Sequence, residues 1–251
     1  MIIDTPKPHH IPALRALWKQ AFGDEDAFLD KFFTHGFSEN RCRCIFEKDR
    51  PVSVLYWFDV TWEGKKLAYL YAVATDQAYQ GQGLCRRLMD DTHNHLHTLG
   101  YHGTVLVPGS ESLFGFYGKM GYFPCSPVHR FSCDAATVTA VQKIAPAEYT
   151  RLRKNYLPEG SILQEGKFLT FLESFACFYQ GENCLFCGSA DNGVFHAQEY
   201  LGDPQAAPGC LAALGLKKGH FRTPGAGAPL AMFYPLSPSE KLPAYLGVPL
   251  D

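Results

Sequence analysis

The sequence predicts an α/β fold: a mixed, mostly antiparallel sheet flanked by helices, followed by a second, related, smaller domain. Two patterns indicate the sheet and its helices. Short apolar or alternating runs are typical of strands, and apolar residues spaced three or four apart are typical of helices. Up to residue 133 these runs give a strand, two helices, three strands, a helix, a strand and a helix, then a strand near His129–Cys133. In such an order, antiparallel hairpins lead into one parallel crossover.

The elements before residue 67 follow from local patterns. Gly23 and Asp24 interrupt a helical spacing and so separate two helices. A turn at 48–51 joins two strands, and a turn at 62–66 leads into the next strand. The expected segments are a strand beginning at Ile2, helices over 13–22 and 28–33, and strands over 41–47 and 52–61.

A strand, a glycine turn and a helix follow one another from Leu67 onward. Residues 67–74 are apolar and strand-like, Gly81 and Gly83 lie in the turn, and a helix follows. The first N–H groups of a helix have no intrahelical partner, and the helix dipole adds partial positive charge there. Glycine lets the backbone approach an anion closely. The segment therefore predicts a site for a phosphorylated cofactor.

Two common phosphate-binding motifs do not fit this turn. In a dinucleotide motif, G-x-G-x-x-G, Arg86 would replace the third glycine and block close helix–strand packing. The Walker motif is absent. The turn instead resembles the R/Q-x-x-G-x-G/A signature of the GCN5-related N-acetyltransferases (GNAT), with Cys where Gly or Ala is usual. The residues that carry this resemblance are Gln80, Gly81, Gln82, Gly83, Leu84 and Cys85.

A second segment, 103–123, resembles the end of the same family's domain. Its apolar run 105–107 is typical of a buried strand, and Ser110 is suited to cap the helix that follows. The run 116–122 reads Phe-Tyr-Gly-Lys-Met-Gly-Tyr and resembles the family's F-Y-x-K-x-G-F ending. The two motifs have the family's order and spacing, so residues 1–134 are identified as similar to a GNAT domain that binds acetyl-CoA.

The resemblance implies an N-acetyltransferase that moves an acetyl group from acetyl-CoA to a primary amine by direct attack. It assigns Tyr117 as the general acid for the CoA thiolate, because a phenol with a pKa near ~10 is protonated at neutral pH. The alternative for Tyr117 is a core aromatic. Backbone amides near Val73 and Thr75 are expected to hold the pantetheine arm and polarise the thioester. Ser110 stands where the family often contacts CoA through Asn, and is otherwise a helix N-cap.

The sequence does not single out a general base for the amine. The strand before the glycine turn offers Tyr69 and Tyr71 but no acid. A base is unnecessary if the enzyme binds the neutral amine. The other candidates are Asp59, Glu63, Glu111 and His129. A non-catalytic CoA-binding or protein-interaction module is the alternative to an enzyme.

Composition limits the partners. A hydrophobic fraction of 46% predicts a full core, and a net charge of −2 does not favour nucleic acid or an anionic membrane. No apolar run approaches the ~18 residues of a membrane span. The N-terminal segment 1–10 lacks a signal peptide's apolar core, so a cytoplasmic protein is expected. The acceptor is expected to be a small-molecule or peptide amine, and the oligomeric state is not indicated.

No metal site is expected among the nine cysteines and ten histidines. Cys184 and Cys187 have C-x-x-C spacing, but no second pair accompanies them, and in a strand they would face opposite sides. Reduced, partly buried thiols are therefore expected. His93 and His97 share a helix face at i, i+4, but Asp90, nearby in sequence with other polar residues, favours a solvated face.

Residues 135–251 are expected to form a degenerate acetyltransferase-like domain. Asn192 and Gly193 mark a hairpin turn. Gly202-Asp203-Pro204 stands where the glycine loop would be, so no CoA site is expected in this half. The alternative is an unrelated α+β extension. The run 223–229 is expected to be a surface loop, or else a loop over the substrate cleft. The expected strands are 138–144, 184–190, 194–201 and 230–236, and the expected helices 146–156, 168–174 and 205–214.

Overall fold

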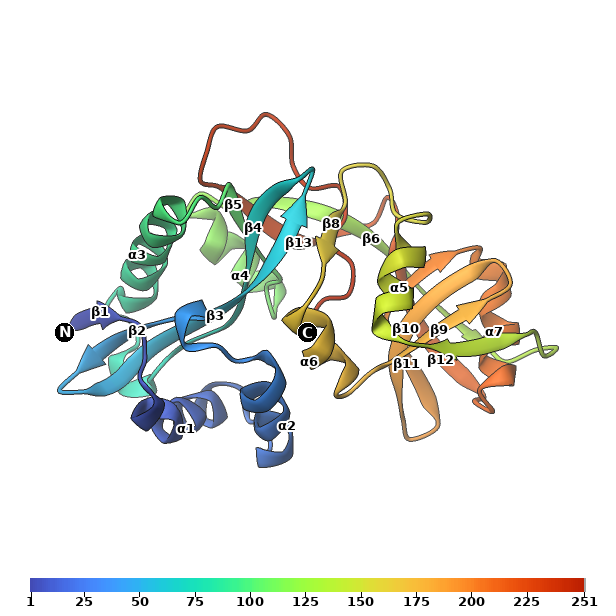
Figure 1. Cartoon of the computed structure of the whole chain (residues 1–251), viewed down its shortest axis with the longest axis horizontal. Helices are drawn as coiled ribbons and strands as arrows, with labels where there is room; N and C mark the ends of the chain where they lie inside the picture. The colour runs from blue at the N-terminus through green and yellow to red at the C-terminus, as the bar shows by residue number, and fades with distance from the viewer. Residues whose placement is uncertain (251) are drawn as a thin grey trace.

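The computed structural model describes residues 1–250, which form one 13-stranded sheet with helices packed against it (Figure 1). The strand order is β1-β2-β3-β4-β5-β13-β6-β12-β11-β10-β9-β7, and β8 pairs with β3. The strands are β1 (Ile2–Asp4), β2 (Cys42–Glu47), β3 (Arg50–Trp62), β4 (Lys65–Thr75), β5 (Gly103–Leu106), β6 (Phe123–Asp134), β7 (Val141–Ile144), β8 (Ile162–Gln164), β9 (Cys177–Gly181), β10 (Cys184–Asp191), β11 (Val194–Gly202), β12 (Lys218–Pro224) and β13 (Ala228–Pro235). The α-helices are α1 (Ile11–Phe22), α2 (Asp26–Lys31), α3 (Leu84–Thr98), α4 (Glu111–Gly118), α5 (Pro146–Arg153), α6 (Lys167–Glu173) and α7 (Ala207–Ala213).

The central strands of the N-terminal half are buried on both faces. On β3, Tyr56 and Phe58 belong to the core cluster that contains Trp18 of α1. The alternate residues Leu55 and Trp57 belong to the cluster that contains the apolar side of α3. Successive strand residues point to opposite faces, so α1 and α3 cover opposite faces of the sheet. This arrangement confirms the predicted mixed, mostly antiparallel sheet flanked by helices.

The last strand of the chain lies inside the N-terminal part of the sheet. β13 pairs antiparallel with β5, where Met232 opposes Leu106, and with β6, where Phe233 opposes Phe123. The predicted strand over 230–236 is therefore confirmed. Its place between β5 and β6 means that the segment from β7 to β12 leaves the sheet after β6 and returns to it through β13 (Figure 1).

The second half repeats the order of elements of the first. β7, α5, α6, β9, β10, β11, α7 and β12 follow one another as β1, α1, α2, β2, β3, β4, α3 and β5 do. The pairings correspond as well, because β4–β5 and β11–β12 are both parallel and each is crossed over by one helix. On this ground we propose that the second half is a related, degenerate copy. The boundary at residue 134 stays a prediction.

A buried ion pair fixes the C-terminal segment between the halves. Arg153 Nε donates to Glu199 Oε2 at 2.7 Å, and Arg153 Nη2 donates to Glu199 Oε1 at 2.9 Å. The same Nη2 reaches the carbonyl oxygen of Leu246 at 3.4 Å. Further on, the backbone N–H of Leu250 donates to Tyr69 Oη of β4 at 3.2 Å. The end of the described chain is thereby held against the N-terminal half.

The expectation of a solvated histidine face on α3 is right for His97 and wrong for His93. His93 is 6% exposed, its Nε2 lies 2.8 Å from Tyr122 Oη, and its ring stacks on Tyr234 at 4.2 Å. Burial lowers the pKa of His93 to about 4. The sequence hid this because Tyr234 belongs to β13, which reaches α3 only through the folded sheet.

Two further patterns in the second half were tested by the fold. The expected loop over 223–229 is too long, because Thr223 and Pro224 belong to β12 and oppose His129 and Val128 of β6. The expectation that Cys184 and Cys187 face opposite sides is confirmed, since they lie in different core clusters. Among residues 1–250, no helix has the length and apolar character of a membrane span.

Candidate functional site

The turn between β4 and α3 adopts the conformation that its glycines predict. Gly81 and Gly83 have φ values of +74° and +73°, which residues with a side chain rarely adopt. Gly83 is the N-cap of α3 and supplies no side-chain cap. Nothing lies within 4 Å of the position that a Cβ would take at either glycine. The first N–H groups of α3 are thus left for an external acceptor.

Side chains within the turn hold it in this shape. Asp76, 4% exposed, accepts a hydrogen bond from the N–H of Ala78 at 2.9 Å and forms an ion pair with Arg50. Gln80 Nε2 donates to the carbonyl oxygen of Thr75 at 3.1 Å, and Gln82 Nε2 donates to that of Ala78 at 3.3 Å. The two glutamines therefore brace the loop, which keeps its backbone N–H groups in a fixed arrangement.

A cavity of about 600 Å³ opens at this end of α3. Most of the predicted site residues line it, whereas Gln82 and Ser110 do not. Ser110 is the exposed N-cap of α4, and its Oγ lies 3.0 Å from Ser112 Oγ. The predicted residues that line the cavity are Val73, Thr75, Gln80, Gly81, Gly83, Leu84, Cys85 and Tyr117.

Two cationic side chains also line this cavity, and the sequence reasoning did not assign them. Arg86 follows the glycine signature, and Lys119 is the Lys of the F-Y-x-K-x-G ending. Arg86 Nη2 donates to the carbonyl oxygen of Lys119 at 2.9 Å, which ties the first turn of α3 to the end of α4. Their place in the two motifs was the available signal. They add positive charge to the helix N-terminus.

β4 and β5 separate beside this cavity. Their parallel pairing is recorded from Leu67 opposite Gly103 to Tyr69 opposite Val105, although β4 continues to Thr75. Ala72 has a φ of +49°, and the β3–β4 register shifts at the same level. A positive φ in a residue other than glycine marks strain that the surrounding structure must hold. The bulge turns the backbone near Val73 toward the space between the strands.

A second cavity, of about 460 Å³, meets the first on the other side of this gap. Val73, Leu113 and Tyr117 line both cavities. Tyr117 is 8% exposed, and burial raises its pKa well above the ordinary tyrosine value. Burial also raises the pKa of the nearby Cys85 thiol to about 11, so that this thiol is uncharged at neutral pH.

None of the four acid–base candidates outside β4 lines either cavity. Asp59 is bound by Arg41, whose Nη2 lies 2.9 Å from Asp59 Oδ2, and Glu63 Oε1 lies 3.6 Å from Lys241 Nζ. Glu111 lies in the first turn of α4, and His129 lies on β6. The sequence reasoning instead missed Asp24, which lines the second cavity and had been noted only as a helix breaker.

One group of His, Cys, Asp or Glu side chains among residues 1–250 has its ligand atoms close together: His9, His10 and Asp49. The N–H of Lys7 donates to His10 Nδ1 at 2.9 Å, so in neutral His10 the proton is on Nε2. This Nε2 lies 3.0 Å from Asp49 Oδ1. A protonated nitrogen has no lone pair for a metal, so the cluster fits a hydrogen bond between α1 and the β2–β3 turn.

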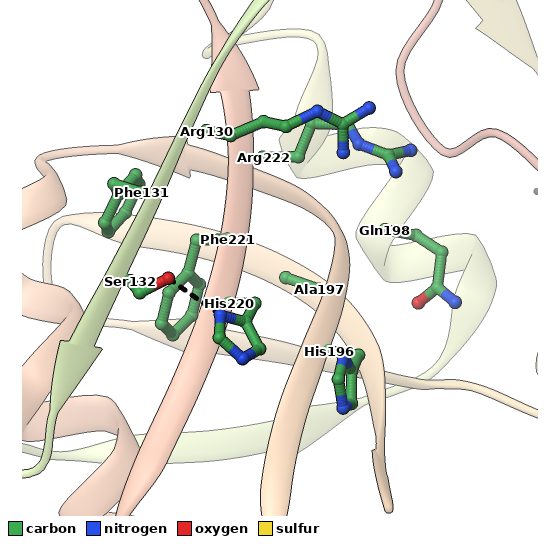
Figure 2. A pocket seen from close by; sticks show the side chains of 9 residues that line it. All are labelled: Arg130, Phe131, Ser132, His196, Ala197, Gln198, His220, Phe221 and Arg222. Carbon is green, nitrogen blue, oxygen red and sulfur yellow. Dashed lines mark hydrogen bonds between the residues drawn. The ribbon is translucent and has the colours of Figure 1, made fainter. Parts of the chain in front are cut away.

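The second half has a cavity of its own, of about 550 Å³, over β11, β12 and β6 (Figure 2). Arg130 and Arg222 oppose each other on β6 and β12, and His196 opposes His220 on β11 and β12. His220 Nδ1 lies 2.7 Å from Ser132 Oγ (Figure 2). The recorded β11–β12 pairing ends at the two histidines, as that of β4 and β5 ends at Tyr69 and Val105. No glycine loop accompanies this second separation.

Comparison with known proteins decides the family. Residues 3–125 match the model of the GNAT acetyltransferase domain. The chain belongs to the GNAT family through this half. The matched domain is an acetyltransferase domain, so acyl transfer is the class of activity that the relationship supports. The curated proteins include no match to the sequence.

Solved structures show the same fold over nearly the whole chain. A GCN5-related N-acetyltransferase from Kribbella flavida is 16% identical with a TM-score of 0.71, and the match covers 94% of this GNAT protein and 72% of that chain. A putative acetyltransferase from Pyrococcus horikoshii is 15% identical with a TM-score of 0.64, covering 99% and 94%. Eis1 from Mycobacterium abscessus is 11% identical with a TM-score of 0.62, covering 92% and 67%. At these identities the likeness establishes the fold.

Proposed function

We propose that this GNAT protein transfers an acetyl group from acetyl-CoA to a primary amine by direct attack. The observation that carries the proposal is the meeting of two cavities at Val73, Leu113 and Tyr117. One cavity ends at the glycine turn and suits the cofactor. The other lies on the far side of the gap between β4 and β5 and suits the acceptor. The thioester would then lie where the two meet.

The cofactor cavity has the chemistry that CoA needs. The pyrophosphate would accept hydrogen bonds from the N–H groups at the start of α3, near Gly81 and Gly83. Arg86 and Lys119 line the same cavity and would neutralise phosphate charge. The pantetheine arm would run along β4 past Thr75 to Val73. Backbone N–H groups there would polarise the thioester carbonyl and stabilise the oxyanion.

Tyr117 is the proposed proton donor. The amine nitrogen forms a bond to the acetyl carbon, the carbon–sulfur bond breaks, and the thiolate takes the phenolic proton. The amide nitrogen gives up one proton, and solvent returns one to the phenol, so the balance closes. Burial holds the Tyr117 pKa above its ordinary value, which keeps the donor protonated across neutral pH.

A thiol-release assay tests this function. Purified protein is given acetyl-CoA and a panel of amines, and free CoA is followed together with the mass of each acetylated product. We expect CoA release to depend on an amine, at a rate well above hydrolysis. Tight binding of acetyl-CoA without turnover of any amine would instead favour the non-catalytic CoA-binding alternative.

A further inference from the structure

The acceptor cavity has an aromatic wall with one charged side chain among its described lining residues. Trp18 packs against Tyr71 at a ring-centroid distance of 5.6 Å and against Phe28 at 6.3 Å. Phe175, which follows α6 in the second half, packs on Phe28 at 5.9 Å and lines the cavity as well. The one charged residue is Asp24, between α1 and α2.

Asp24 differs from its neighbours in having no cationic partner among residues 1–250. Asp26 and Asp30 both pair with Arg15, at 3.1 Å and 2.8 Å, and Asp26 also pairs with Lys19 at 2.6 Å. Asp24, by contrast, is recorded in no ion pair with a described residue. Its Oδ2 accepts a hydrogen bond from Trp18 Nε1 at 2.7 Å, and no described donor reaches its Oδ1.

A half-buried carboxylate at the edge of an apolar cavity is costly unless a cation compensates it. The indole N–H fixes one carboxylate oxygen and leaves the other for a ligand. Aromatic faces also attract cations, through their quadrupole. The cavity therefore combines three features that favour an ammonium group with an apolar substituent: a fixed carboxylate, ring faces and an apolar volume.

We propose that Asp24 binds the ammonium group of the acceptor, and that the acceptors are primary amines on a compact apolar or aromatic body. This inference rests on the proposed function, because it assigns the second cavity to the acceptor. It makes Asp24 a specificity-determining residue. The rings of Trp18, Phe28 and Tyr71 would surround the apolar body. Polyamines and amino sugars would be poorer ligands, since most of their polar groups would meet no partner.

Calorimetry on the protein saturated with CoA tests this recognition apart from catalysis. The probes are 2-phenylethylamine, its uncharged analogue 2-phenylethanol, and spermidine. We expect 2-phenylethylamine to bind more tightly than the other two. Asp24→Asn keeps an oxygen for the Trp18 N–H and removes the charge, so it should weaken 2-phenylethylamine binding by about 10–100-fold and leave 2-phenylethanol unchanged. Affinity for CoA should not change.

Asp26→Asn is the matched control, because it removes a carboxylate two residues away that already has cationic partners. It should leave binding of all three probes unchanged, and melting curves establish that both variants fold. Equal affinity of wild type and Asp24→Asn for 2-phenylethylamine would overturn the proposal, as would tighter binding of spermidine. Asp24-dependent binding without acetylation would contradict the proposed function and support the recognition. Acetylation that does not depend on Asp24 would have the opposite meaning.

Discussion

The turn from β4 to α3 and the turn from β11 to α7 have the same place in the two halves of the sheet and opposite capacities for an anion. The first has Gly83 as an N-cap without a side-chain bond, ahead of a helix of 15 residues. In the second, the Asp203 carboxylate accepts a hydrogen bond from the N–H of Gln205 at 2.9 Å. Pro204 and Pro208 supply no N–H at all.

The difference shows that the order of elements fixes where a site is possible and that a few turn residues decide whether it exists. A carboxylate at a helix start takes the hydrogen bonds that a phosphate would accept and repels its charge. The second half thus keeps the strand separation over β11 and β12 and lacks the means to hold CoA there. Its remaining contribution to the proposed site is Phe175 and the C-terminal segment with Leu250.

The largest expected effect concerns Tyr117, which has no counterpart role in the second half. Tyr117→Phe keeps the ring and removes the proton donor, so kcat should fall by about 10²–10⁴-fold while acetyl-CoA affinity stays nearly constant. The rate is measured by thiol release on an accepted amine. Tyr179→Phe, on β9 of the second half, is the control and should retain full activity. Full activity of Tyr117→Phe would remove the general acid from the account.

The next effect tests how the second half supports the acceptor cavity. Arg153→Met leaves Glu199 as an uncompensated buried charge, which costs about 3–5 kcal/mol of unfolding free energy. The C-terminal segment should also loosen, so the acceptor KM should rise more than the acetyl-CoA KM. Urea unfolding and steady-state kinetics measure the two effects. Arg151→Met, on the exposed side of the same helix, is the control. Equal effects of the two variants would show that the ion pair does not fix this segment.

The stability of the N-terminal half should fall in mild acid because of His93. Its pKa is lowered to about 4 in the fold, so between pH 6.5 and 4 the unfolded chain binds a proton that the native protein does not. Stability is therefore complete above pH 6.5 and is lost as the pH falls. From pH 7 to 5 this group should reduce the unfolding free energy by about 2 kcal/mol. Urea titrations at both pH values measure the loss, which His93→Gln should abolish and His97→Gln should not.

The smallest expected effect concerns the cap of the second half. Asp203→Ala removes the side chain that accepts the Gln205 N–H, which should lower the unfolding free energy by about 1 kcal/mol. The number of acetyl-CoA sites should not change, because Pro204 and Pro208 still withhold their donors. Calorimetric titration of this variant measures both points. A new CoA site would show that Asp203 alone blocks the second half.

The sequence predicted what local chemistry controls and missed what depends on distant pairing. The left-handed glycines 81 and 83 and the hairpin at Asn192 follow from turn chemistry, and the structure has both. The insertion of β13 between β5 and β6 joins Met232 to Leu106, and no local pattern encodes such a contact. The burial of His93 depends on that same insertion. Asp24 looked like a helix breaker because its role depends on a cavity that only the fold assembles.

The central claim is that the glycine turn of the N-terminal half is the one place in this chain that holds CoA. Calorimetric titration of acetyl-CoA into wild type, Gly83→Asp and Gly100→Asp tests it most directly. Both glycines are left-handed with open space around them, at opposite ends of α3, so the strain of each substitution is similar, about 1–2 kcal/mol. We expect one site per chain, lost in Gly83→Asp and kept in Gly100→Asp. Two sites in the wild type, or unchanged affinity in Gly83→Asp, would contradict the claim.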